Sequence, residues 1–121
     1  MPHSFPTEAH VDLSELQRAA DAMLGEMPDG YWPPLANLAR LTEEVGEFAR
    51  ALNQRVGPKR LKAGEQPEDI ALEMGDILFT LAVMANQLGI DLGQSAADAL
   101  RKYRRRDLGG REEAGQPNGG A

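Results

Sequence analysis

The sequence predicts an all-α protein, a four-helix-bundle-like domain with helices at about 13–27, 35–55, 68–88 and 92–107. Apolar residues recur in these segments at intervals of three and four, which is the spacing of one helix face. Turns rich in proline and glycine separate the segments, and no stretch has the alternation of a convincing strand. At 121 residues the chain suits one domain, expected over 12–108 between a flexible leader (1–11) and a disordered tail (109–121).

The first two expected helices start at clear signals. Asp12 and Glu15 match a capping box before the first helix, and Pro28-Asp29-Gly30 ends it as a turn. Pro33-Pro34 precedes the second helix, since proline is tolerated in a first turn. We expect an apolar stripe on this second helix to face the core: Leu38, Leu41, Val45, Phe48 and Leu52.

The third and fourth segments differ in character. Beyond Ile70 the third is apolar nearly all the way round, so we expect it to be the central and most buried helix. The fourth begins after Asp91, which forms a capping box with Gln94, and is expected to end near Asp107.

Composition narrows the classes of function. The net charge of −6 argues against stable nucleic-acid binding, which needs a basic surface. There is no cysteine, which fits a reducing compartment. The N-terminal residues lack the pattern of a signal peptide, and the longest apolar stretch is too short to span a bilayer. We therefore expect a cytoplasmic protein with no membrane partner.

Two carboxylates within the apolar third segment demand a partner. Glu73 and Asp76 are three residues apart and so project from one face of the helix. A buried, ionised carboxylate must protonate, form an ion pair or bind a metal, because burial without a partner costs several kcal/mol. Two interpretations stay open at this point, a buried ion pair with arginines and a divalent cation site.

The second helix supplies a matching acidic face. At about 100° per residue, Glu43, Glu44 and Glu47 lie beside the apolar stripe, and Arg40 shares their sector. Alone, such a face is most often solvated. Facing Glu73 and Asp76 across an antiparallel helix pair, it favours a hard cation with oxygen ligands, Mg²⁺ or Mn²⁺. Zinc and di-iron sites are disfavoured because the two histidines lie in the leader.

The motifs LARLTEEVGEFARALN (38–53) and EMGDILFTLAVMANQLGIDL (73–92) resemble those of the MazG-like nucleotide pyrophosphohydrolases, an all-α superfamily, and especially its short single-domain members. The family pattern is E-x-x-E followed by E-x-x-D. Here it reads Glu44 to Glu47, then 25 intervening residues, then Glu73 to Asp76.

The resemblance implies Mg²⁺-dependent hydrolysis of nucleoside triphosphates to the monophosphate and pyrophosphate, as in clearing unwanted nucleotides from the cellular pool. It implies that Glu44, Glu47, Glu73 and Asp76 hold the metal and that Glu43 acts on the attacking water. It also places Asn86 in the substrate pocket and Lys102 and Arg106 at the phosphates, and it implies a homodimer or a homotetramer built from dimers. These roles are expectations, and the structure shows where each residue lies.

Several alternatives stay open in the sequence. A non-catalytic oligomerisation or regulatory module with an acidic partner-binding face would also show a glutamate-rich helix. Arg40 either neutralises the glutamates or touches substrate. Trp32 either anchors packing or stacks on a base. Arg104 and Arg105 are expected to complement the helix dipole at the end of the fourth helix.

Overall fold

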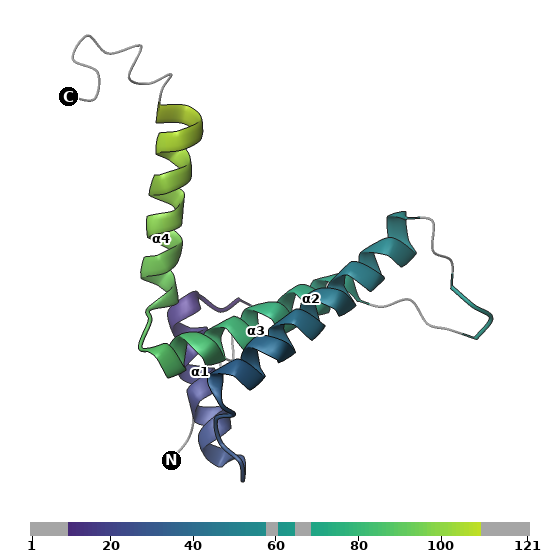
Figure 1. The fold of residues 1–121 in the computed structure, drawn as a ribbon, viewed down its shortest axis with the longest axis horizontal. Helices are drawn as coiled ribbons and strands as arrows, with labels where there is room; N and C mark the ends of the chain where they lie inside the picture. Colours follow the sequence, from purple (N-terminus) through teal and green to yellow (C-terminus); the bar gives the residue numbers. More distant parts are fainter. Residues whose placement is uncertain (1–9, 58–60, 65–68, 110–121) are drawn as a thin grey trace. The chain divides into compact units, whose positions relative to one another are not determined.

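The computed structural model describes residues 10–57, 61–64 and 69–109, and within these ranges the fold is all-helical, as expected. The α-helices are α1 (Leu13–Glu26), α2 (Pro34–Val56), α3 (Ile70–Leu88) and α4 (Leu92–Tyr103), followed by a short π-helical segment, η1 (Arg104–Gly109) (Figure 1). None of the described helices is long and apolar enough to cross a membrane. Most of the expected leader and nearly all of the expected tail lie outside the described residues.

The chain divides into two compact units. The first extends to Ile90 and contains α1, α2 and α3. Within it, α2 and α3 lie side by side and antiparallel, and α1 packs on α3 as well (Figure 1). Helix α3 is thus the central helix of this unit, as expected. The antiparallel pairing brings the acidic segment of α2 to the beginning of α3.

Aspartate side chains cap the N-termini of α1 and α3. Asp12 accepts a hydrogen bond from the Glu15 backbone N–H at 2.8 Å, and the Glu15 carboxylate accepts one from the Asp12 N–H at 2.9 Å, so the expected capping box is formed. Asp69 caps α3 in the same way, through the N–H of Leu72. At the other end of α3, Gly89 adopts a φ of 68°, a left-handed conformation that favours glycine.

The core of the first unit is small, and it is built mainly from alanines. Its buried apolar residues are Ala19, Ala20, Leu24, Ala51, Ala82, Val83 and Ala85. Helices α1 and α3 contribute three of them each and α2 contributes one, yet Leu72, Met74 and Leu78 in the N-terminal half of α3 are 61%, 53% and 46% exposed. The expectation that α3 is deeply buried therefore holds for its C-terminal half only, because α1 covers that half.

Of the apolar stripe expected to form the core side of α2, three of five residues are exposed in the single chain, whereas Leu41 and Phe48 are partly buried. Leu38, Val45 and Leu52 are 47%, 46% and 41% exposed. The buried positions of α2 include Asn37 and Ala51, and they lie about 80° further round the helix. The expectation was therefore right for the edge of the stripe that holds Leu41 and Phe48 and wrong for the rest, because the face that α2 turns toward α3 is centred further round the helix. Glu44 lies near the middle of this buried face.

The second unit begins at Asp91 and is described by itself. Asp91 accepts a hydrogen bond from the Gln94 N–H, whereas the Gln94 side chain bonds Asp98, so only half of the expected capping box forms. The α-helix ends at Tyr103 and not near Asp107. The backbone stays helical to Gly109, but with the wider π-type turn.

Candidate metal centre

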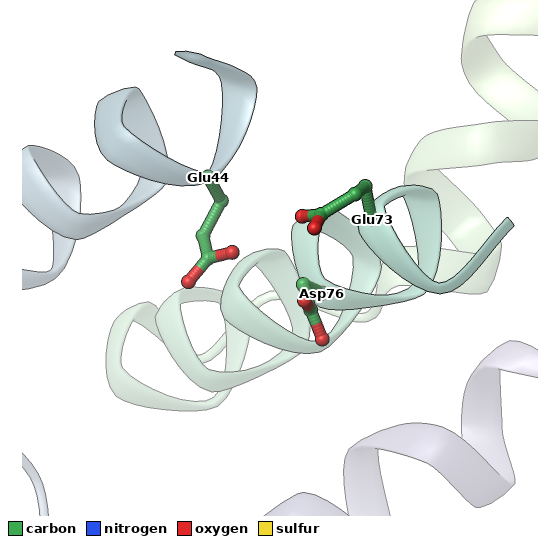
Figure 2. A group of neighbouring side chains, drawn as sticks. All are labelled: Glu44, Glu73 and Asp76. Carbon is green, nitrogen blue, oxygen red and sulfur yellow. The ribbon is translucent and has the colours of Figure 1, made fainter. Parts of the chain in front are cut away.

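Three carboxylates from two helices meet at one place in the first unit. Glu44 reaches from α2 toward Glu73 and Asp76 on α3 (Figure 2). One carboxylate oxygen from each lies within 4.8 Å of the other two, and all three residues are partly buried. Residues 29 and 32 positions apart in the chain are thus brought together by the antiparallel pairing of α2 and α3.

Local helix geometry explains this meeting. Glu73 and Asp76 are three apart and so leave α3 on the same side, toward α2. Thr80, one turn further on, is 1% exposed and donates its hydroxyl to the backbone carbonyl of Asp76 at 3.0 Å. Like charges at this separation repel by a few kcal/mol in a partly buried site. A divalent cation would reverse the sign of that interaction.

The donor set fits a hard cation. All three groups are carboxylates, and oxygen ligands are those that Mg²⁺ and Mn²⁺ prefer. Oxygens bound to one Mg²⁺ lie about 2.1 Å from it, and therefore at most about 4 Å from one another. The separations of up to 4.8 Å need only small side-chain rotations to reach that range.

Arg40 is the cation next to this group. Its Nε lies 3.8 Å from Glu44 Oε1, one turn along α2. Its guanidinium also lies over the rings of Trp32 and Phe79, at 5.8 and 5.9 Å from their centroids. Two aromatic faces thus hold the arginine beside the carboxylates.

The other two glutamates of the acidic segment lie outside the group of three. Glu47 has a half-exposed side chain, and its Oε2 lies 3.9 Å from Arg50 Nη1. Glu43 is exposed on α2, next to Glu44 in the sequence but about 100° further round the helix.

Asn86 joins α1 to α3. Its carbonyl oxygen accepts a hydrogen bond from Gln17 Nε2 at 3.0 Å, and its amide donates to the Gln17 backbone carbonyl at 2.9 Å. Gln17 Nε2 also donates to the carbonyl of Ile90 at 2.8 Å. In the single chain the Asn86 amide therefore has protein partners from α1.

Lys102 and Arg106 both belong to the second unit. Lys102 Nζ lies 4.7 Å from the centroid of the Tyr103 ring, and the Arg106 guanidinium lies 5.2 Å from it. The two cations expected at the phosphates thus both lie next to the ring of Tyr103. The neighbouring Arg101 forms an ion pair with Asp98.

Sequence reasoning missed two polar residues near the site, Asn37 and Gln87. Asn37 is 3% exposed, and its Nδ2 donates to Gln87 Oε1 at 2.9 Å across the α2–α3 contact. One signal was present, because Asn37 lies seven residues before Glu44 and so shares its helix face. Gln87 sits at the end of an apolar helix and offered no comparable pattern.

Together these features define a class of protein, an all-α chain with a carboxylate cluster between two antiparallel helices. The family model described as the MazG nucleotide pyrophosphohydrolase domain matches residues 33–108. That range contains the whole of α2, α3 and α4 and all three clustered carboxylates. The chain belongs to the MazG nucleotide pyrophosphohydrolase family.

Relatives from Bacillus agree with this assignment. YpjD of Bacillus subtilis (strain 168) is 41% identical over 95 residues, which cover 78% of this chain and 86% of YpjD. YvdC of the same organism is 32% identical over 65 residues, which cover 49% of this chain and 61% of YvdC.

Solved structures extend the similarity to the fold. The crystal structure of YpjD from Bacillus subtilis superposes with a TM-score of 0.69 at 38% identity, over 79% of this chain and 98% of that one. A Bacillus-conserved MazG protein, described as a nucleotide pyrophosphohydrolase, gives a TM-score of 0.68 at 38% identity, over 83% and 97% of the two chains. At these identities the likeness includes the helical fold described above.

Proposed function

We propose that this protein is a Mg²⁺-dependent hydrolase, with Mn²⁺ as an alternative ion, that converts nucleoside triphosphates to nucleoside monophosphates and pyrophosphate. The observation that carries the proposal is the meeting of Glu44, Glu73 and Asp76 between α2 and α3 in a chain of the MazG family. The corresponding physiological role is the removal of unwanted nucleotides in the cytoplasm.

The metal would be held by the three clustered carboxylates, with Glu47 as a fourth ligand. Glu47 lies one turn beyond Glu44 on α2, and its contact with Arg50 is an exposed ion pair. Exposed pairs contribute at most about 1 kcal/mol, so exchanging Arg50 for a divalent cation costs little. When bound, Mg²⁺ neutralises charge on phosphate oxygens and lowers the pKa of water.

The chain's own residues would orient the reactants. Phosphoryl chemistry depends mainly on positioning and electrostatics and needs no covalent nucleophile. Arg40, beside Glu44, would contact the phosphate chain of the substrate. Asn86 would contact the nucleoside, and Lys102 and Arg106 are proposed as further residues that bind phosphate.

Glu43 would act on the attacking water. The water oxygen bonds to the α-phosphorus, the bond from that phosphorus to the bridging oxygen breaks, and pyrophosphate leaves. The proton lost by the water passes to the Glu43 carboxylate. The exposed position of Glu43, adjacent to Glu44 but outside the carboxylate cluster, keeps it available for this role.

We further propose that the protein works as a homodimer or as a dimer of dimers. Exposed apolar residues of α2 and α3 support this, since a second copy would cover apolar surface that the single chain leaves open to water. They are Leu38, Val45, Leu52, Leu72, Met74 and Leu78. A core made mainly of alanines is small for a stable single chain, which is a second reason to expect partner subunits.

The reaction can be tested with the full chain and a panel of ribo- and deoxyribonucleoside triphosphates in ¹⁸O-labelled water. We expect Mg²⁺-dependent formation of pyrophosphate and of a monophosphate that carries the label, with loss of both products in Asp76→Asn. Orthophosphate and a diphosphate as products would contradict the proposed bond cleavage. Absence of hydrolysis across the panel, with Mg²⁺ and with Mn²⁺, would favour a non-catalytic module instead.

A further inference from the structure

An open pocket lies beside the carboxylate cluster. It holds about 500 Å³ of empty space, a figure that includes the open solvent at its mouth. Its apolar wall comes from Leu24, Met27 and Val83, and its other side carries Trp32, Asn37 and Arg40. An apolar wall with an aromatic ring and a few polar groups suits a flat, partly polar ligand.

Residues of the pocket and of the carboxylate cluster lie on the same faces of α2 and α3, one after the other along the two helices. Asn37, Arg40 and Glu44 are spaced by three and four residues, so they occupy one face of α2 on successive turns. On α3, Val83 lies two turns beyond Asp76 on the same face. Seven residues of helix correspond to about 10 Å, a length comparable to that from a nucleobase to the phosphates beyond its ribose.

Arg40 joins the two regions, because it lines the pocket and also lies 3.8 Å from Glu44. A ligand with an aromatic group in the pocket and an anionic chain at the cluster would therefore pass this guanidinium.

Two side-chain amides hold the backbone of Trp32 in place. Its backbone carbonyl accepts hydrogen bonds from Asn37 Nδ2, at 3.4 Å, and from Gln87 Nε2. Asn37 Nδ2 also donates to Gln87 Oε1, which locks the two amides together. The tryptophan nevertheless remains 47% exposed. A fixed backbone under an exposed indole describes a preformed stacking surface better than a buried packing anchor.

We propose that this pocket binds the nucleobase of the substrate, that Trp32 stacks on the base, and that Asn37 and Gln87 are positioning residues for Trp32. The inference rests on the proposed function, since it places the base relative to the phosphates at the carboxylate cluster. In this arrangement Arg40 lies where the nucleoside joins the phosphate chain.

Trp32 is the sole tryptophan of the chain, so its fluorescence reports on the pocket directly. The full-length protein is titrated in EDTA with nucleosides, nucleoside monophosphates and inorganic tripolyphosphate. We expect the first two to quench the emission saturably and tripolyphosphate to leave it unchanged. Quenching by tripolyphosphate alone, or by none of the three, would overturn the assignment of the base.

Steady-state kinetics provide the second measurement. Trp32→Ala should raise KM for nucleoside triphosphates about tenfold, which is the scale of one lost stacking contact. Gln87→Ala should raise KM more than it lowers kcat, because it loosens Trp32 without touching the reacting atoms. Leu88→Ala is the matched control, an adjacent exposed position in the last turn of α3, and should leave both constants unchanged.

The two proposals fail in different ways. Hydrolysis with unchanged KM in Trp32→Ala would remove the base pocket and leave the proposed function intact. Saturable quenching by nucleosides without hydrolysis of any triphosphate would remove the proposed function and leave a nucleoside-binding pocket.

Discussion

The guanidinium of Arg40 and the carboxylate of Glu44 lie 3.8 Å apart on successive turns of α2, and the rings of Trp32 and Phe79 hold that guanidinium in place. Arg40 thus partly neutralises the carboxylate cluster when no metal is bound. The same cation would meet the phosphate chain of a bound nucleotide. This double role predicts opposite effects on metal binding and on substrate turnover.

The substitution Arg40→Gln separates these effects. Loss of the neighbouring positive charge should tighten Mg²⁺ binding a few-fold, since the carboxylates then attract the ion without competition. Loss of a charged phosphate contact should lower kcat/KM about tenfold. Metal activation curves and steady-state kinetics measure the two effects. Parallel weakening of both would contradict the double role.

Glu43 can be tested by removing its charge while keeping its size. Glu43→Gln should lower kcat by about 100-fold or more, the scale of a lost general base, and should leave metal affinity unchanged. Single-turnover hydrolysis and Mn²⁺ binding measure the two quantities. A variant with near wild-type kcat would exclude Glu43 from action on the water.

The exposed stripe of α2 predicts a change in oligomeric state. Val45→Lys places a charge where a second copy would pack, so we expect the dissociation constant of the oligomer to rise on the order of 100-fold. Val11→Lys is the matched control, because Val11 and Val45 are 48% and 46% exposed and receive the same substitution. Light scattering after size-exclusion chromatography over a range of concentrations distinguishes them. Equal masses for wild type and Val45→Lys at every concentration would place the interface elsewhere.

Tyr31 predicts a pH dependence of stability. Burial, followed by the hydrogen bond that its hydroxyl donates to Asp21, raises the pKa of Tyr31 above its ordinary value of 10.0. The folded state therefore holds this proton more tightly than the unfolded state does. The resulting stabilisation is complete below the ordinary pKa and disappears as the pH rises through the raised pKa.

The variant Tyr31→Phe isolates this contribution. At neutral pH the variant should be less stable by about 1 kcal/mol, the scale of one hydrogen bond. Its difference from wild type should shrink as the pH rises above the ordinary tyrosine pKa. Thermal unfolding of both proteins across this range provides the comparison. A constant difference at all pH values would show that the ionisation of Tyr31 is not linked to folding.

The sequence was sufficient to predict the helices, because their determinants are local. Asp12, Asp69 and Asp91 cap helices through bonds to residues three positions away, and Gly89 ends α3 through its own backbone conformation. Such features depend on neighbouring residues only. The expected helix limits accordingly agree with the structure to within two residues, except at the end of α4.

The packing face of α2 could not be predicted in the same way. The apolar stripe that contains Leu38 and Val45 is the strongest pattern on the helix, yet α2 turns the face of Asn37 and Glu44 toward α3. Which face packs within the chain depends on the partner helix and on what other subunits cover. Neither is encoded in local periodicity.

The carboxylate cluster could be predicted in part. The spacing of Glu73 and Asp76 in an apolar helix indicated that both carboxylates share one face and need a partner. That Glu44 joins them, while Glu47 faces Arg50, depends on the rotation of α2. For the proposed base pocket, the sequence offered stacking on a base as one of two roles of Trp32, but the support from Asn37 and Gln87 could not be predicted, because these two residues meet only through tertiary packing.

Binding of Mn²⁺, followed by electron paramagnetic resonance in the absence of nucleotide, tests the central claim most directly. Asp76→Asn keeps the size of the side chain and removes one charge from the cluster, and Asp98→Asn on α4 is the matched control. We predict saturable binding in wild type and in Asp98→Asn, and a dissociation constant raised at least about tenfold in Asp76→Asn. Equal affinity in all three proteins would contradict a metal centre at Glu44, Glu73 and Asp76.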